Sequence, residues 1–329
     1  MPFYRNILKQ SWKLTWKNKY LWVFGIFAAL LGNGYGLEIL FNNAYGDSGQ
    51  SLFPAWQRIV STGVFSAKTY SNIGNLFKND TLNIMIYLVI LLIVLAILIF
   101  LVWLVVVSQA AVVASSAAII KQKKSSLREG MDSGRLNFWP VLALNILTKT
   151  VIYMMFAVIS LPIIFSQESF NANLFYVLAL IIAAPLAIIL SFIMKYAIAY
   201  VIIYGSKAGQ ALKQSWQLFK DNWLISLEMA VILFFINFLV GLGTILAILA
   251  LAVPFLFLGL LFYYSLALVG SWLIVILALT GFLSIIMIVG ASLSVFQIAS
   301  WTSLFLELDK KRGTSKLVRI VNSLAKVGQ

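Results

Sequence analysis

The 329-residue sequence contains no cysteine and no histidine. Their absence excludes disulfide bonds, thiolate nucleophiles, imidazole acid–base catalysis, and zinc or haem sites that depend on these ligands. Charged residues are also scarce, at 10% of the chain, whereas 62% of the residues are hydrophobic. A soluble domain is nearer to about 25% charged and about 45–50% apolar. The composition therefore predicts an all-α integral membrane protein.

Six apolar stretches are long enough to cross the roughly 30 Å of a bilayer's hydrocarbon, which takes about 20 residues. They cover residues 20–41, 82–118, 138–165, 174–205, 223–253 and 272–305. Residues 223–306 contain almost no polar break, so eight spans are an alternative. With six spans, Pro254 to Gly270 is expected to be a re-entrant or interfacial element in which Pro254, Gly259 and Gly270 break the helix.

Basic residues are concentrated on one side of this arrangement. Segments 1–19, 119–137, 206–222 and 306–329 hold most of the 24 Lys and Arg, and the other side holds only Arg58, Lys68 and Lys78. Short basic segments stay in the cytoplasm during insertion, so both termini are predicted to be cytoplasmic. The net charge of +14 is spread over four short segments. This favours anionic lipid headgroups over nucleic acid as partners, with a protein partner as an alternative.

Three segments align without gaps, end in Asn, and run directly into a span. They are LKQSWKLTWKN at 8–18, LREGMDSGRLN at 127–137 and LKQSWQLFKDN at 212–222. In each copy the i, i+4 and i+7 positions, such as Leu8, Trp12 and Thr15, share one face, and basic residues occupy the others, as is typical of a helix in the membrane interface. The expected interfacial anchors are Trp12, Trp216, Lys9, Lys213 and Arg128.

Two spans follow each of these segments. The sequence therefore predicts a six-span helical bundle built from three repeats of an interfacial helix and a helix pair. The repeats cover approximately residues 1–120, 121–205 and 206–307 of a single membrane domain, 1–329, and residues 308–329 form a cytoplasmic amphipathic tail. The outer loop, 42–81, is expected to include an amphipathic helix near residues 53–64.

Two stretches resemble a known family. GQALKQSWQLFKDNW at 209–223 and FQIASWTSLFLELDKKRG at 296–313 are similar to the membrane domain fused to some bacterial glycerophosphodiester phosphodiesterases, which also occurs in stand-alone membrane proteins. The resemblance implies a membrane module in the bacterial inner membrane. In that family the hydrolytic chemistry belongs to a separate soluble barrel, so the resemblance implies no catalytic residue in this chain.

Three ionisable residues fall inside the expected spans, where a charge costs about 2.5–3.5 kcal/mol at the helix centre on insertion scales. Lys149, Lys195 and Glu228 all lie towards the cytoplasmic leaflet, and Glu228 is expected to pair with Lys195 or Lys149. The alternative is that the long Lys side chains extend to the headgroups. Asn145 and Asn237 are expected to hydrogen-bond across helices, or to line a polar cavity with the three charges.

The sequence shows no cluster of catalytic acids, bases or metal ligands. The favoured function is therefore a non-enzymatic membrane module, without a cofactor, that binds lipid or a partner protein. One alternative is a transporter or channel for a small solute or lipid that uses the buried Lys and Glu groups. Another is a membrane enzyme acting on lipid, for which Glu129, Asp132 and Asp221 would supply the acid–base groups.

Overall fold

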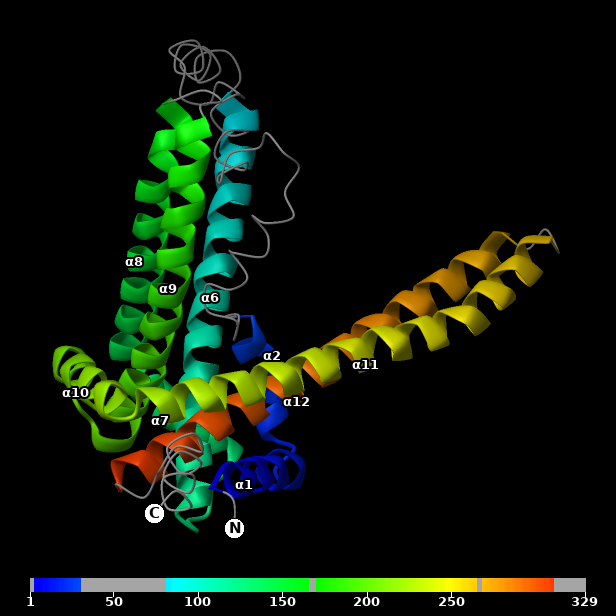
Figure 1. The fold of residues 1–329 in the computed structure, drawn as a ribbon. Helices are drawn as coiled ribbons and strands as arrows, with labels where there is room; N and C mark the ends of the chain where they lie inside the picture. The colour runs from blue at the N-terminus through cyan, green and yellow to red at the C-terminus, as the bar shows by residue number, and fades with distance from the viewer. Residues whose placement is uncertain (1–2, 31–80, 166–169, 265–267, 311–329) are drawn as a thin grey trace, which may run out of the picture. The chain divides into compact units, whose positions relative to one another are not determined.

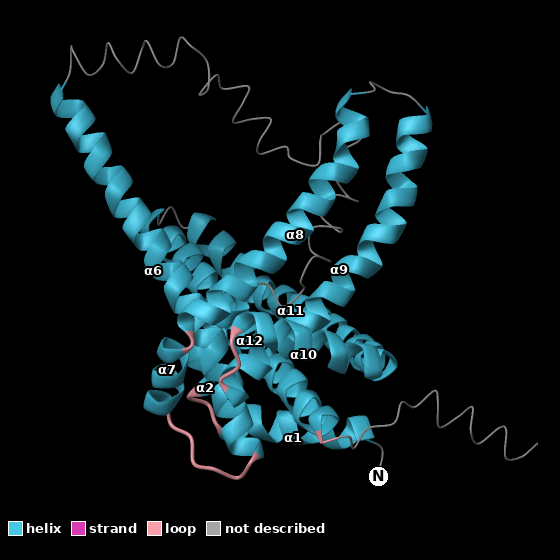
Figure 2. Ribbon diagram, turned by 90° about the vertical axis from the view of Figure 1, so that its left-hand side faces the viewer, coloured by secondary structure: helices cyan, strands magenta, loops and turns pink. Residues whose placement is uncertain are grey.

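The structure is a computed structural model that describes residues 3–30, 81–165, 170–264 and 268–310. Within these ranges it contains nine helices and no strand, as Figures 1 and 2 show. The expectation of an all-α chain is confirmed for this part. The outer half of the first expected span, the outer-loop helix at 53–64 and residues 311–329 of the expected tail lie outside the described residues.

Five helices are long and apolar enough to cross a membrane, counted over the described residues. They are α6 (Thr81–Ile120), α8 (Phe138–Phe165), α9 (Phe170–Tyr204), α11 (Trp223–Tyr264) and α12 (Leu268–Asp309). An α-helix satisfies its backbone hydrogen bonds internally, which is what a segment in hydrocarbon requires. The composition and these helices together make the chain a membrane-embedded protein.

Four shorter helices precede or connect the long ones. They are α1 (Phe3–Lys17), α2 (Leu21–Ala29), α7 (Leu127–Leu136) and α10 (Ala208–Asp221). Three of them, α1, α7 and α10, contain the aligned segments found in the sequence, and we refer to these three as the boundary helices. Each lies directly before a more apolar helix, namely α2, α8 and α11.

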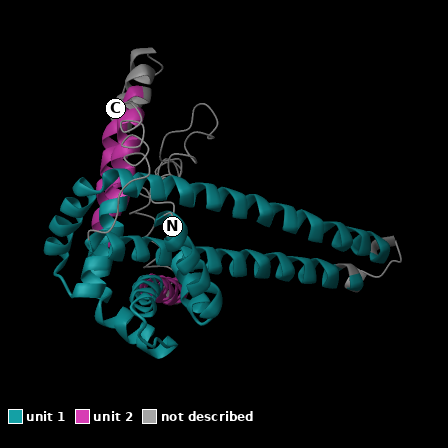
Figure 3. Cartoon of the chain, turned by 60° about the horizontal axis from the view of Figure 1, so that its bottom comes forward, with its two compact units in different colours: residues 1–33, 105–144, 192–329 teal, residues 34–104, 145–191 magenta. Residues whose placement is uncertain are grey.

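The chain divides into two compact units, coloured separately in Figure 3. Unit 1 comprises residues 1–33, 105–144 and 192–329, and unit 2 comprises residues 34–104 and 145–191. Unit 2 has its own small core, in which α8 and α9 pack through Ile152, Phe156, Ala183 and Ala187.

The core of unit 1 is built around the last turns of α6. One set of α6 residues, including Val106 and Ala110, packs against α8, α9 and α10. A second set, Ala111 and Val112, packs against α1, α2 and α12, where it meets buried side chains such as Phe24. Small residues let helices approach closely, so the Ala- and Ser-rich run at 110–118 suits this central position.

Helices α11 and α12 pack against each other along a hairpin (Figure 1). The expected re-entrant element is wrong, because α11 continues through Pro254 and Gly259 to Tyr264, and α12 has already begun at Leu268, before Gly270. A proline removes one backbone hydrogen bond, and helices in apolar surroundings tolerate this loss by local adjustment. The segment expected to contain two or four spans therefore forms two helices of 42 residues each.

Candidate functional site

Each boundary helix ends at an asparagine that makes the same connection to the next helix. The three side-chain amides donate to the carbonyl oxygen four residues earlier: Asn18 to Leu14 at 2.9 Å, Asn137 to Ser133 at 2.9 Å and Asn222 to Leu218 at 3.1 Å. The carbonyl oxygen of each asparagine accepts a backbone N–H from the following helix, from Leu21, Val141 and Ser226 respectively. Each asparagine thus satisfies groups on both sides of the break between helices.

The boundary helices bury small residues at equivalent positions. Ser11, Gly130 and Ser215 occupy the same place in the three aligned segments, and all three are buried. One turn later the buried residues are Thr15, Gly134 and Phe219. A Cβ atom built at Gly134 would collide with the carbonyl oxygen of Val107 in α6, so α7 lies as close to α6 as a helix can.

The buried face differs from the predicted apolar stripe by one position in its first turn. Trp12 and Trp216 are 55% and 53% exposed, although Thr15 in the same stripe is buried. In membrane proteins the closest helix contacts use small residues, which explains why Ser11 and Ser215 face the core and their Trp neighbours do not. The sequence contained this signal, since the fourth residue of each aligned segment is Ser or Gly.

The expected interfacial anchors all lie on the exposed side of the boundary helices. Lys9, Lys213 and Arg128 are exposed, as are the two Trp side chains. The Trp12 ring also contacts Phe296 of α12 edge-on, with 6.0 Å between centroids. An amphipathic ring with one side against protein and the other exposed suits the headgroup region of a bilayer.

Glu228 is held by a contact that the sequence did not predict. The hydroxyl of Tyr4 in α1 donates a hydrogen bond to the Glu228 carboxylate in α11. Farther along α11, the side-chain amide of Gln297 in α12 donates to the side-chain oxygen of Asn237. The latter is a cross-helix hydrogen bond of the kind expected for Asn237.

Lys195 lies against aromatic rings. Its amine is 4.3 Å from the ring centroid of Trp301 and 5.7 Å from that of Phe192. A cation over an aromatic face gains about 2 kcal/mol or more where water is excluded. The next residue, Tyr196, is fully buried and shares a hydrogen bond of 2.7 Å with the hydroxyl of Ser226.

The five predicted intramembrane polar residues are divided between the two units. Lys195, Glu228 and Asn237 belong to unit 1, whereas Asn145 and Lys149 belong to unit 2. Asn145 is buried and Lys149 is exposed on α8. The pairing of Glu228 with one of the two lysines stays a prediction.

Sequence reasoning missed a second polar contact near the ends of α9 and α12. The hydroxyls of Tyr200 and Tyr204 both donate to the carboxylate of Asp309, the former over 3.3 Å. These residues are more than 100 positions apart in the chain, so no local pattern could have indicated the contact.

Of the acidic residues considered for catalysis, one caps a helix and two are exposed. Glu129 forms a capping box at the start of α7: its carboxylate accepts the backbone N–H of Ser126 at 3.0 Å, and the Ser126 hydroxyl accepts the N–H of Glu129 at 3.3 Å. Asp132 and Asp221 are exposed on α7 and α10. Among the described residues, no three His, Cys, Asp or Glu side chains are grouped as a metal site would require.

Comparison with known proteins gives a family and no function. No curated protein and no solved structure matches the chain. The profile of a family described as "Family of unknown function (DUF7544)" matches residues 23–302, which is most of the chain. The chain therefore belongs to this family of unknown function, DUF7544.

Proposed function

We propose that the chain is a non-enzymatic multi-pass membrane module whose boundary helices bind anionic phospholipid at the cytoplasmic face. The observation that carries this proposal is the shared layout of α1, α7 and α10. Each packs small or polar residues towards the core and exposes Lys or Arg on the opposite faces, and α1 and α10 also expose Trp. Basic side chains near an anionic membrane surface contribute about 1 kcal/mol each, so the layout suits a lipid headgroup layer.

The finer architecture belongs to the same proposal. We infer six spans in three repeats, with both termini in the cytoplasm of a bacterial cell. The three equivalent asparagine connections support the repeat, because each links a boundary helix to the helix that follows it. The resemblance to the membrane domain of glycerophosphodiester phosphodiesterases would make this chain a related module without the enzyme.

The test is the lipid dependence of stability. The full chain is purified in a neutral detergent, and its thermal midpoint is measured with phosphatidylglycerol or phosphatidylcholine at equal concentration. We expect phosphatidylglycerol to raise the midpoint more, and added salt to reduce the difference, since exposed charges are screened beyond about 10 Å at 0.1 M salt. In the variant K9Q/K213Q the difference should shrink, whereas K149Q should leave it unchanged because Lys149 lies outside the boundary helices.

Equal stabilisation by the two lipids would overturn the proposal. Selective stabilisation by a water-soluble small molecule, with no lipid preference, would favour the transporter instead. A protein partner that binds the wild type and fails to bind K9Q/K213Q, again without lipid preference, would assign the boundary helices to protein recognition.

A further inference from the structure

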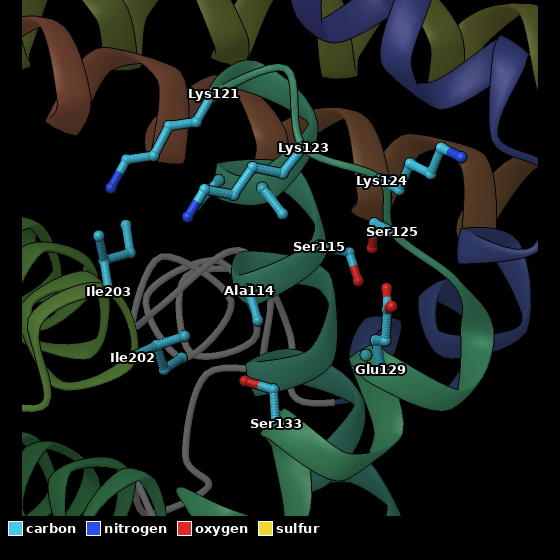
Figure 4. A pocket seen from close by; sticks show the side chains of 13 residues that line it. Ala114, Ser115, Lys121, Lys123, Lys124, Ser125, Glu129, Ser133, Ile202 and Ile203 are labelled. Carbon is cyan, nitrogen blue, oxygen red and sulfur yellow. The ribbon is translucent and has the colours of Figure 1, made fainter.

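A cavity of about 270 Å³ lies in unit 1 where α6 ends and α7 begins. Its wall is formed by the last turns of α6, the connection from 121 to 126, the first turns of α7 and Ile202 and Ile203 of α9 (Figure 4). Cavities for drug-sized ligands are typically about 300–1,000 Å³. This cavity is slightly smaller than that range, so its volume suits a small headgroup.

The charge around the cavity is strongly positive. Lys121, Lys123 and Lys124 line it, and Glu129 is the one acidic residue among the lining side chains. The carboxylate of Glu129 is already a hydrogen-bond acceptor in the capping box of α7. In Figure 4 the side chains of Lys121 and Lys123 extend in the same direction, towards Ile203, whereas Lys124 points the other way. Two amines thus face the same space.

A buried hydroxyl of α6 lines the cavity on the side away from these two amines. Ser115 of α6 is 2% exposed, and its Oγ atom has no hydrogen-bond partner among the described residues. Figure 4 shows this hydroxyl directed across the cavity towards Glu129. A Cβ atom at Gly130 would lie 2.8 Å from the Ser115 oxygen and 3.1 Å from the Phe24 ring, so α7 packs closely against this side of the cavity. Lys121 and Lys123 are therefore the donors around the cavity that can bind one ligand together.

We propose that this cavity binds the phosphate of an anionic phospholipid. The amines of Lys121 and Lys123 are charged donors from which phosphate oxygens can accept hydrogen bonds. The apolar wall of Ile202, Ile203 and Ala118 matches the glycerol and upper acyl part of a lipid better than it matches a free ion. The choice of lipid rests on the proposed function, and the phosphate chemistry rests on the cavity itself.

The experiment measures how tightly the full chain retains a lipid in detergent. Phosphatidic acid and phosphatidylcholine are added to the wild type and to K121Q/K123Q, and bound lipid is counted by native mass spectrometry. The matched control is K149Q/K310Q, which removes the same charge from exposed positions outside both the cavity and the boundary helices. We expect about a tenfold or greater loss of phosphatidic acid affinity in K121Q/K123Q and less than about a twofold loss in the control.

The outcomes separate the two proposals. Equal losses in both double variants would overturn the cavity as a distinct site and leave the proposed function standing. Equal retention of phosphatidic acid and phosphatidylcholine by the wild type would overturn both. Displacement of the lipid by inorganic phosphate at equal concentration would assign the cavity to the free ion and overturn the lipid as its ligand.

Discussion

The two halves of α6 differ in composition and in exposure. Residues 85–102 are apolar, mostly Leu, Ile and Val, and all of them are exposed. Residues 105–113 are buried and include Ser and Ala. Helix α12 repeats the difference, with exposed residues such as Leu273 and Leu283 in its first half and buried ones such as Ser294 and Ala299 in its second. The large exposed apolar surface of the first half of each helix is unfavourable in water.

The difference indicates whether hydrocarbon or protein surrounds each half of these helices. The large apolar side chains need hydrocarbon around them, because no described part of the chain covers them. Small and polar side chains bring helix backbones together and hydrogen-bond across the contact. Unit 1 therefore has a protein-packed base, formed by residues 105–120 of α6, 192–204 of α9, 291–309 of α12 and the boundary helices. The apolar arms of α11 and α12, residues 234–262 and 272–288, extend from it.

The largest expected effect comes from removing a large buried side chain of the packed base, which leaves a void. Phe305 is fully buried, and its ring lies 4.7 Å from that of Tyr200, measured between centroids. Phe305→Ala should lower the free energy of unfolding by about 3–5 kcal/mol, the usual range for a core Phe. Denaturation in sodium dodecyl sulfate, followed by circular dichroism, measures this change. Phe257→Ala on the exposed arm of α11 is the control and should have little effect. Equal losses would contradict the division into base and arm.

A smaller loss is expected from adding one methyl group to the base. A Cβ atom at Gly25 of α2 would collide with the carbonyl oxygen of Ala291 in α12. Gly25→Ala should therefore lower the free energy of unfolding by about 1–3 kcal/mol, as overpacking usually does. Gly241 in the arm of α11 has nothing near its Cβ position, so Gly241→Ala should be neutral or stabilising by up to about 1 kcal/mol. A stable Gly25→Ala variant would show that α2 and α12 can separate freely.

The sequence was sufficient for the helices and insufficient for their packing. Apolar runs predicted α6, α8, α9, α11 and α12, and the aligned LKQSW-type segments located the boundary helices. The packed face of α1 and α10 was misplaced because Trp12 and Trp216 were grouped with it, whereas the structure exposes both and buries Ser11 and Ser215. Pro254 was wrongly predicted to break the helix, because a proline that ends a helix in a soluble protein is tolerated within a helix in apolar surroundings.

In the candidate site too, some features follow from local sequence patterns and others require the folded structure. That Lys9, Lys213 and Arg128 would be exposed could be predicted, because amphipathic patterning is local in the sequence. Their role as interfacial anchors stays a prediction. The contacts of Tyr4 with Glu228 and of Lys195 with Trp301 join residues far apart in the chain, so they required the folded structure. Ser115 and the lysines around the cavity became visible only when α6 and α7 were placed against each other.

Loss of one asparagine connection should cost less than either core change. Asn222→Ala removes the side-chain hydrogen bond to Leu218 at the end of α10. We expect a loss of about 0.5–1.5 kcal/mol in the free energy of unfolding, the usual net value of one hydrogen bond. Gln217→Ala, on the exposed face of the same helix, is the control and should stay within about 0.5 kcal/mol of the wild type. The same loss in both variants would mean that the hydrogen bond from Asn222 to Leu218 adds no stability of its own.

The smallest effect is a coupling within the polar contacts of the base. Tyr4→Phe and Glu228→Gln remove the two partners of one hydrogen bond, so a double-mutant cycle on their unfolding free energies should show a coupling. Interhelical hydrogen bonds in membrane proteins average about 0.6 kcal/mol in such cycles, with a maximum near 1.7.

A second cycle, Lys195→Met with Glu228→Gln, tests the ion pair that the sequence predicts, and we expect a coupling of similar size. The control cycle combines Glu228→Gln with Lys213→Met, an exposed charge on α10, and should be additive. Coupling of Glu228 to Tyr4 alone would reject the ion pair and leave Lys195 with its contact to Trp301. Additivity in every cycle would show that the base depends on shape rather than on these polar contacts, because small buried residues would then account for its stability without them.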